Sequence, residues 1–248
     1  MLTSMKKTCS MKRPGSAKGF SLVELMVAMT AGLIVLAAIL VFTVTTARSA
    51  SSNIRSTRMM QELRSSLNLI EREIRRSGFD ETSYKFAGTC VSASGVCPVS
   101  NFNSLTISSG TCLVVSYDKF SNTTPGTISA GEFHGFRLKP STTPGVIQAS
   151  LAGSTAPVCT DSATSTNWVD VSNPAIIDVT NLSFTQPTTT GGCVTTSSGL
   201  WIVVQDVLVQ IAGQWVDPAS HQVTARSIEE SVRVKNDRIS KTQPSFCP

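Results

Sequence analysis

The sequence predicts an α+β fold in which a long N-terminal α-helix packs on an antiparallel β-sheet domain. Three features predict it: an apolar run over residues 20–42, a helix-periodic stretch without Pro or Gly over 43–77, and short apolar runs separated by Gly, Ser, Thr and Pro over 78–248. Charged residues make up only 15% of the 248 residues, and aromatic residues 6%. This composition is typical of a Thr- and Val-rich β domain outside the cytoplasm and unlike a cytosolic enzyme with a large Leu-rich core.

A basic leader opens the chain. Its five basic residues, with no acidic residue among them, are Lys6, Lys7, Lys12, Arg13 and Lys18. They account for the formal net charge of +5, because the other 16 basic residues equal the 16 acidic ones. The basic isoelectric point therefore reports the leader and does not indicate a nucleic-acid site. Basic residues before an apolar segment favour a cytoplasmic N-terminus, with the following domain across the membrane.

Residues 20–42 form the expected membrane span. As a helix, this run of 23 residues is about 35 Å long, enough to cross a hydrocarbon core of about 30 Å. A secretory signal peptide has a shorter apolar region of about 7–15 residues. The segment is therefore predicted to stay in the membrane as a single span in contact with its lipids.

Glu24 lies inside this apolar run. A charged side chain at the centre of a bilayer costs about 2.5–3.5 kcal/mol, and less near the end of a span. One hypothesis is that Glu24 is an interfacial carboxylate that reaches the headgroups. The other is that the chain is cut between Gly19 and Phe20, which creates an amine four residues before Glu24. The carboxylate of one subunit then pairs with the amine of a neighbour and selects the register of a helical polymer.

The basic leader, the run Gly19-Phe20-Ser21-Leu22-Val23-Glu24 and the long apolar helix together resemble the class III signal of type IV pilins and pseudopilins. The resemblance implies the pilin fold, cleavage by a prepilin peptidase after Gly19 and N-methylation of Phe20. It also implies that Glu24 is the assembly carboxylate. Gly19 lacks a Cβ, which lets a protease approach the backbone closely.

The same resemblance implies that residues 1–19 are a leader that is removed. This leader is long for the type IVa class. A start at Met11, in place of Met1 or Met5, gives MKRPGSAKG, which is closer to the family.

The helix is expected to continue over residues 43–77. Four apolar residues at spacings of four, three and four form one stripe: Leu63, Leu67, Ile70 and Ile74. Glu71 and Arg75 have the spacing of an i,i+4 ion pair, and Gly78 has the position of a helix stop. The stripe is expected to pack on the protein's own β domain, with a coiled-coil partner as the alternative.

The end of this helix carries a second resemblance. The run Glu73-Ile74-Arg75-Arg76-Ser77-Gly78-Phe79 is similar to the helix end of PilW-type minor pilins, and Lys235-Asn236 is similar to the Arg-Asn that ends many of those chains. The large pseudopilin of type II secretion has a similar helix end. On its residues alone, the motif predicts a capped helix end with Phe79 packed beneath it.

Residues 78–248 contain the expected strands of the globular domain. They are 105–107, 112–117, 133–138, 145–151, 168–171, 176–184, 201–211 and 227–235. The run Ser108-Ser109-Gly110 indicates a hairpin turn between the first two, and Gly213 is expected at the turn after 201–211, the longest strand. The stretch 227–235 is expected to be the last strand. Residues 121–130 and 185–199 are expected to be loops.

Seven cysteines indicate an oxidising compartment. Cleavage after Gly19 removes Cys9 and leaves an even number of disulfide candidates: Cys90, Cys97, Cys112, Cys159, Cys193 and Cys247. The short loop between Cys90 and Cys97 favours that pair, and Cys247 is a candidate tether of the C-terminus. The sequence does not choose among the remaining pairings.

No catalytic set, metal site or cofactor is predicted. The chain has no C-x-x-C, and its two histidines, His134 and His221, are far from the cysteines in the sequence. The aspartates are scattered without a shared motif. We therefore expect a protein that is not an enzyme; a membrane-anchored periplasmic hydrolase is the enzymatic alternative.

By resemblance, the protein is expected to be a minor pilin of a type IV pilus. It would belong to a complex that primes or caps pilus assembly and supports adhesion, twitching motility or DNA uptake. The implied partners are other minor pilins, the major pilin, the prepilin peptidase and the inner-membrane assembly platform. The implied location is the inner membrane, with the globular domain in the periplasm, and later the pilus tip at the cell surface.

Two further alternatives stay open. One is a minor pseudopilin at the tip of a type II secretion system. The other is a membrane-anchored receptor for DNA or a surface, although the formal neutrality of the chain after Gly19 makes nucleic acid an unfavourable partner.

Overall fold

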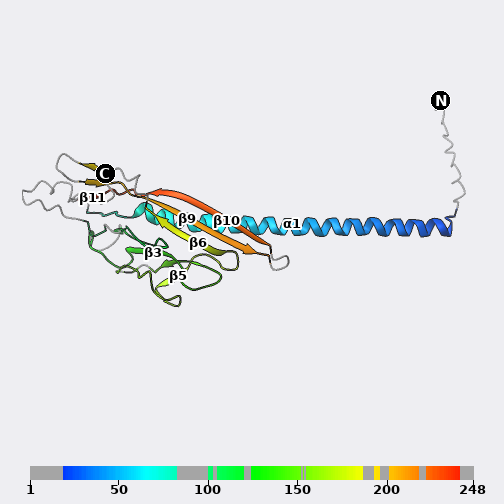
Figure 1. Cartoon of the computed structure of the whole chain (residues 1–248), viewed down its shortest axis with the longest axis horizontal. Helices are drawn as coiled ribbons and strands as arrows, with labels where there is room; N and C mark the ends of the chain where they lie inside the picture. Colours follow the sequence, from blue (N-terminus) through cyan, green and yellow to red (C-terminus); the bar gives the residue numbers. More distant parts are fainter. Residues whose placement is uncertain are drawn as a thin grey trace, which may run out of the picture. The chain divides into compact units, whose positions relative to one another are not determined.

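The computed structural model describes residues 19–82, 100–102, 105–119, 124–151, 153, 155–186, 193–195, 201–217 and 222–240. The chain divides into two compact units, residues 1–53 and 54–248. Over the described ranges, one helix, α1 (Leu22–Arg76), precedes eleven strands. They are β1 (Leu105–Ser108), β2 (Cys112–Ser116), β3 (Phe133–Leu138), β4 (Ile147–Ser150), β5 (Trp168–Asp170), β6 (Asp178–Thr185), β7 (Cys193–Thr195), β8 (Trp201–Val203), β9 (Asp206–Val216), β10 (Val223–Arg233) and β11 (Arg238–Ser240). A long N-terminal helix followed by antiparallel sheets confirms the predicted α+β class (Figure 1).

The helix α1 begins and ends within two residues of the predicted bounds. Its first backbone bond runs from the amide of Leu25 to the carbonyl of Ser21 (3.1 Å). The absence of Pro from the sequence of α1 permits a single long helix. Gly78 follows α1 with a φ of +75°, the left-handed conformation that commonly ends helices and that glycine adopts without steric cost.

The first sheet has five antiparallel strands in the order β1-β2-β3-β4-β5, so each strand pairs with its neighbour in the sequence. The predicted hairpin is confirmed. Ser108 pairs with Cys112, and the turn residues Ser109 and Gly110 have φ values of 51° and 70°. Two positive φ values in a hairpin turn match the right-handed twist of the flanking strands.

The second sheet has the order β10-β9-β6 and corrects one prediction. The single strand expected over 201–211 is wrong, because the chain forms β8, leaves the ladder at Val204 and Gln205, and starts β9 at Asp206. Gly213 is not at a turn but inside β9. There, Ile177 Cδ1 lies 2.4 Å from the position that a Cβ would take, so the strand needs a residue without a side chain.

A third sheet, in the order β11-β8-β7, corrects two further predictions. β7 lies inside the stretch 185–199, for which a loop is expected, and β11 follows β10, so 227–235 is not the last strand. Both of these strands have three residues. A segment of three residues is too short to show an alternating pattern, so periodicity does not reveal it.

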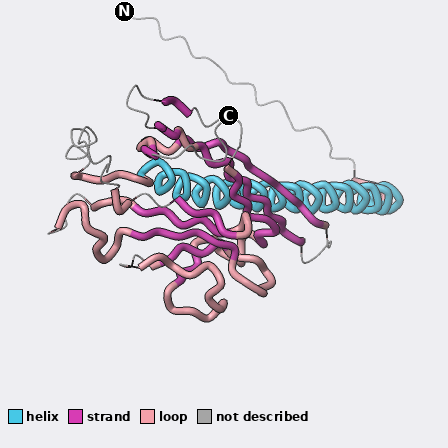
Figure 2. Tube along the Cα trace, turned by 60° about the vertical axis from the view of Figure 1, so that its left-hand side comes forward, coloured by secondary structure: helices cyan, strands magenta, loops and turns pink. Residues whose placement is uncertain are grey.

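The main core lies in the second unit, between α1 and the two larger sheets. Figure 2 shows the strands that lie beside the helix. The buried apolar residues that α1 contributes are Met59 and the predicted stripe, Leu63, Leu67, Ile70 and Ile74. Val207, Val209 and Ile211 alternate along β9 and are fully buried, as expected for a strand with one face on a core. The stripe therefore packs on the protein's own β domain, as predicted.

Candidate functional site

The start of α1 is open to solvent. Gly19 and Phe20 precede the helix, and Phe20 is 82% exposed. Among the described residues, no atom lies within 4 Å of the position that a Cβ on Gly19 would take. The peptide bond between Gly19 and Phe20 is therefore accessible, as a protease requires.

Glu24 lies in the first turn of α1 and is exposed. It is the only charged residue between Phe20 and Arg48. In the described part of the chain, no hydrogen-bond or ion-pair partner is found for its carboxylate. The N-terminal end of a helix favours a negative charge, and Ser21 and Glu24 have the S-x-x-E spacing of a capping box. The capping-box bonds themselves are not formed, because the Glu24 carboxylate has no partner among the described residues.

Residues 20–47 present an uncovered apolar surface. The most apolar 18-residue window of α1 has a mean hydropathy of 2.8, and none of it is buried. By length and composition, α1 is able to cross a membrane. Phe20, Leu33, Ile34 and Phe42 are each more than 60% exposed. An apolar surface of this extent marks a region that lipid or other helices cover, and its length and composition suit a membrane anchor.

The threonine hydroxyl groups of this segment are paired inside the helix. Thr30, Thr43, Thr45 and Thr46 donate to backbone carbonyls three or four residues earlier, at 2.8–3.1 Å. Such bonds remove most of the cost of placing a hydroxyl group in hydrocarbon. The one charged side chain of the segment, Glu24, is different. No described residue pairs with its carboxylate, so nothing offsets the cost of placing its charge in hydrocarbon.

The C-terminal end of α1 is tied to two strands of the second unit. The amide of Gly78 donates to the carbonyl of Ser116 at the end of β2 (2.9 Å). Asn236, beyond β10, donates its side-chain amide to the carbonyls of Ser77 (3.0 Å) and Arg76 (3.4 Å). The last carbonyls of a helix have no partner within it. Asn236 is therefore a C-terminal cap that comes from 159 residues later in the chain.

The predicted contacts at this helix end are confirmed in part. Arg75 and Glu71 form the expected i,i+4 ion pair. The expectation that Phe79 packs beneath the helix end is wrong, since Phe79 is 38% exposed. Its backbone is held instead, because its carbonyl accepts from the amide of Asp118 (2.8 Å).

Glu73 is a buried carboxylate on the inner face of α1, only 5% exposed. It accepts hydrogen bonds from the hydroxyl of Tyr117 (2.6 Å) and from Arg72 Nε (3.1 Å). His134 on β3 stacks on Tyr117, with ring centroids 4.7 Å apart. The motif around Glu73 does not reveal this cluster, because Tyr117 lies 44 residues away in the sequence.

The surroundings shift the pKa values of the two rings in this cluster. Burial and the hydrogen bond to Glu73 raise the pKa of Tyr117 to about 12. Burial lowers the pKa of His134. Both rings are therefore uncharged at neutral pH, and the Tyr117–Glu73 hydrogen bond joins α1 to the first sheet.

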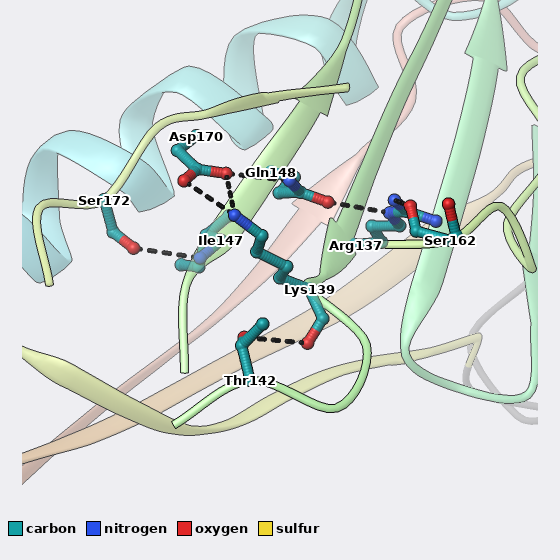
Figure 3. Close-up of polar contacts among 8 residues, drawn as sticks. All are labelled: Arg137, Lys139, Thr142, Ile147, Gln148, Ser162, Asp170 and Ser172. Atoms are coloured by element: carbon teal, nitrogen blue, oxygen red, sulfur yellow. Dashed lines mark hydrogen bonds and ion pairs between the residues drawn. The ribbon is translucent and has the colours of Figure 1, made fainter. Parts of the chain in front are cut away.

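Arg137 on β3 is the largest fully buried side chain of the described residues, at 1% exposure. Its guanidinium donates to Gln148 Oε1 (3.0 Å; Figure 3). It also donates to three carbonyls of the loop 159–162 (2.6–3.1 Å). It also stacks on Trp168, 4.2 Å from the ring centroid. A buried guanidinium is stable only when its donors are paired, so Arg137 fixes this loop against the first sheet.

The network around Arg137 extends across three strands of the first sheet. Gln148 on β4 donates to Asp170 on β5 (2.7 Å), and Asp170 pairs with Lys139 (3.0 Å) at the surface (Figure 3). The arrangement can therefore present the loop 159–162 to a partner in one conformation.

Cys112 and Cys159 form a disulfide between β2 and this same loop. The cysteines Cys90, Cys97 and Cys247 lie outside the described residues, so the Cys90–Cys97 pair stays a prediction. Cys193 begins β7, and its pairing stays open. His221 also lies outside the described residues. Over the described ranges, no group of three or more His, Cys, Asp or Glu side chains is placed to hold a metal ion.

Comparison with known protein families gives two matches. The family described as Prepilin peptidase-dependent protein B matches residues 52–234, and the Prokaryotic N-terminal methylation motif matches residues 15–40. No curated protein and no solved structure gives a match. The methylation motif contains Gly19, Phe20 and Glu24, and the other match contains both larger sheets and the buried part of α1. Because that match covers most of the sequence, the chain belongs to the family of prepilin peptidase-dependent protein B, and it is a type IV pilin-like protein with a prepilin-type N-terminus.

Proposed function

We propose that the protein is a PilW-type minor pilin of a type IV pilus, which joins other minor pilins in a complex that primes or caps the filament. The observation that carries this proposal is the bare apolar helix over residues 20–47, with Glu24 in its first turn. Such a helix has two stable environments, a membrane before assembly and a bundle of similar helices afterwards. The helix end over 73–79 and Asn236 resemble the PilW type and support the finer assignment.

The proposed mechanism is non-enzymatic and depends on the pairing of charges. A prepilin peptidase cuts after Gly19, and the amine of Phe20 is methylated and keeps its positive charge. Inside an apolar bundle, an unpaired Glu24 carboxylate costs several kcal/mol, so it is stabilised most by the amine of a neighbouring subunit. Only one axial stagger of two helices brings these groups together. The pair would therefore select the register in which the subunit is added.

The sheet domain would provide the specificity for other minor pilins. The Cys112–Cys159 disulfide, Arg137 and Asn236 hold distant segments in one arrangement. A pre-ordered surface loses little conformational entropy when it binds a partner. In this proposal the domain lies in the periplasm while α1 is in the inner membrane, and at the pilus tip after assembly. Partners would include the major pilin and the inner-membrane assembly platform.

Processing is tested by the intact mass of the protein isolated from membranes. The expected mass starts at N-methylated Phe20. The variant Gly19→Val should keep its leader, because a branched side chain blocks the approach of the protease to the backbone. Gly32→Val is the matched control, since no atom lies within 4 Å of a Cβ at either glycine. A leader retained by the unchanged protein, in cells with an active prepilin peptidase, would contradict the proposal.

The role of Glu24 is tested by Glu24→Gln, which removes the charge and keeps the shape. We expect normal processing but a loss of the protein from the sheared pilus fraction and fewer pili. Glu62→Gln, in the second unit, is the control and should be incorporated normally. Normal incorporation and normal pilus number with Glu24→Gln would show that Glu24 acts only as a helix cap or an interfacial carboxylate.

The assembly is identified by crosslinking in cells, followed by mass spectrometry of the crosslinked subunits. Minor pilins of a type IV pilus support the proposal. Subunits of a type II secretion system would instead place the protein at the tip of a pseudopilus. Binding of DNA that is saturable and weakened by salt would favour the receptor alternative.

A further inference from the structure

The strand β10 lies at one edge of the second sheet. The order of that sheet is β10-β9-β6, and all 11 residues of β10 pair with β9 in an unbroken register, without a bulge. The sequence of β10 contains no Pro and no Lys, which natural proteins commonly use to block an edge strand. An edge of this length and regularity is a template for one further strand.

The backbone bonds at the two ends of the pair show which groups of β10 face away from β9. The amide of Asp217 donates to the carbonyl of Gln222, and the amide of Val234 donates to the carbonyl of Gln205, both at 2.9 Å. Residues in an antiparallel pair alternate between bonding to their partner and pointing away from it. Even-numbered residues of β10 therefore bond to β9. The odd-numbered residues, which are all exposed and whose amides have no partner in the described part of the chain, are Val223, Ala225, Ser227, Glu229, Ser231 and Arg233.

Two charged side chains of β10, Arg226 and Glu230, flank Ile228 on one face of the strand, because alternate residues share a face. Ile228 is half-buried and packs against the main core. Arg226 donates to the carbonyl of Ala225 (3.2 Å), and over the described ranges neither charge forms an ion pair. An added strand would gain most with an acidic residue opposite Arg226, an apolar residue opposite Ile228 and a basic residue opposite Glu230. The two charges also disfavour a purely apolar strand, which gives the edge specificity.

The segments of this chain outside the described residues do not match this pattern. All 16 acidic residues of the sequence lie within the described ranges, so none of the other segments contains an acidic residue to face Arg226. The complementary strand is therefore expected to come from another molecule.

A second copy of β10 has the right order of charges but the wrong direction. Within the second unit, α1 and β10 run the same way. Arg55 contacts Trp215, which pairs with the second residue of β10, and Ser77 accepts a hydrogen bond from Asn236, which follows β10. In an antiparallel pair of β10 strands, the chains would enter the two domains at opposite ends. Two copies that enter from the same side of a membrane do not meet in this way.

We propose that β10 binds an extended segment of a different polypeptide as a further, antiparallel strand of the second sheet. This segment carries a basic, an apolar and an acidic residue opposite Glu230, Ile228 and Arg226. Main-chain hydrogen bonds to the odd-numbered residues provide affinity, and the two charges provide selectivity. That the segment belongs to a fellow pilus subunit rests on the proposed function, whereas the addition of a strand does not.

The binding test uses the full chain in detergent micelles and the fluorescent peptide TVTKTVTETVT. In an antiparallel pair this peptide places Lys, Val and Glu opposite Glu230, Ile228 and Arg226. The control peptide, TVTETVTKTVT, has the same composition with the two charges exchanged. Fluorescence anisotropy should show saturable binding of the first peptide and roughly five-fold weaker binding of the control. Exchanging the charges in the protein, Arg226→Glu with Glu230→Lys, should reverse this preference.

The contribution of the main chain is tested at Ser227, in the middle of β10. Ser227→Pro removes an outward amide and should weaken binding of the first peptide roughly ten-fold, whereas Ser227→Ala keeps the amide and should bind as the unchanged protein does. In the free protein, the amides of Ser227 and Glu229 should exchange their hydrogen roughly 100-fold faster than those of Ile228 and Glu230. Binding of the peptide should slow the exchange at Ser227 and Glu229.

Three results would overturn the proposal. Absent binding, or equal binding of the two peptides to the unchanged protein, would mean that β10 does not select a strand by its charges. Slow exchange at Ser227 and Glu229 in the free monomer would mean that the chain covers its own edge. Slow exchange only in a dimer, seen by sedimentation, would mean that a second copy occupies the edge. None of these results depends on incorporation into a pilus, so they are separate from the tests of Glu24.

Discussion

Arg137 carries a charge where almost no water reaches it. Its guanidinium is held by Gln148, by the Trp168 ring and by three backbone carbonyls. No carboxylate in the described part of the chain pairs with it directly. Backbone carbonyls that lose their donor inside a protein each cost about 1–3 kcal/mol. At the scale of a single residue, replacing Arg137 should therefore lower the free energy of unfolding more than replacing any other side chain discussed.

We expect Arg137→Met to lower the free energy of unfolding by about 3–5 kcal/mol, because the loop carbonyls and Gln148 lose their donor while only the volume is kept. The measurement is the urea midpoint at an unchanged m-value. Lys139→Met is the control. Its surface pair with Asp170 should contribute less than about 1 kcal/mol. Equal midpoints for the two variants would show that the Arg137 network is not a stabilising contact.

Tyr117 predicts the alkaline limit of the fold. Its pKa is raised from an ordinary value of 10.0 to about 12 by burial and the bond to Glu73. The native state therefore keeps its phenolic proton more tightly than the unfolded chain. The stabilisation is complete below pH 10 and is lost as the pH rises to about 12. The measurement is the tyrosinate absorbance as a function of pH. The variant Tyr117→Phe contains only Tyr84, so the difference between the two titration curves is that of Tyr117.

Glu73→Gln is the second variant in this experiment. It removes the negative charge beside the phenol, so the Tyr117 titration should move down toward pH 10. If both tyrosines of the unchanged protein ionise near pH 10, the buried Glu73–Tyr117 contact is contradicted.

At the scale of an element, the end of α1 is closed by a residue from the other end of the domain. Asn236 donates to the carbonyls of Ser77 and Arg76, and the amide of Lys235 donates to the carbonyl of Arg75 (3.4 Å). The Lys235 amide and the Asn236 side chain thus donate the hydrogen bonds that water would otherwise donate to these carbonyls. The left-handed Gly78 gives this segment access to them, because it turns the chain away from the helix axis.

Asn236→Ala should lower stability by about 1 kcal/mol, the net value of a typical hydrogen bond. Asn236→Asp should cost more, since a carboxylate cannot donate and its negative charge lies at the negative end of the helix dipole. Lys235→Ala keeps the backbone bond and should change stability by less than about 0.5 kcal/mol. Thermal unfolding of the three variants ranks them. Stability of Asn236→Asp equal to that of the unchanged protein would exclude the cap.

At the scale of the whole molecule, one loop is held by two unrelated contacts. The Cys112–Cys159 disulfide closes a loop with a sequence separation of 47, and Arg137 binds the carbonyls beside Cys159. A covalent link acts mainly on the unfolded chain by limiting its conformations, whereas Arg137 stabilises the folded one. Both act on the position of the same few residues.

Replacing both cysteines, Cys112→Ala with Cys159→Ala, should lower the free energy of unfolding by about 4 kcal/mol, as expected from the entropy of a loop of this length. Adding Arg137→Met should cost less than the sum of the separate effects, because the loop is already free to move. Guanidinium unfolding of the single, double and combined variants measures this coupling. Strict additivity would show that the two contacts act on different parts of the fold.

Much of this architecture follows from short-range rules. The bounds of α1, the stripe from Leu63 to Ile74 and the turn at Ser109-Gly110 depend on residues within a few positions of one another, and all were predictable. The split between β8 and β9 was not predictable, because an apolar run does not show where a ladder is interrupted. Gly213 has the same appearance in the sequence as a turn glycine, and only the side chain of Ile177 beside it explains its place in β9.

The sequence by itself determined the class of the protein: a basic leader, Gly19-Phe20, Glu24 and an apolar helix suited to a membrane. The tertiary structure decided how the domain is held together. Tyr117 meets Glu73 across 44 residues, Cys112 meets Cys159 across 47, and Asn236 meets Ser77 across 159. The physical reason is that helix periodicity and turn preference are properties of neighbouring residues. Burial of a carboxylate, a guanidinium or a helix end instead depends on which distant segments pack beside it.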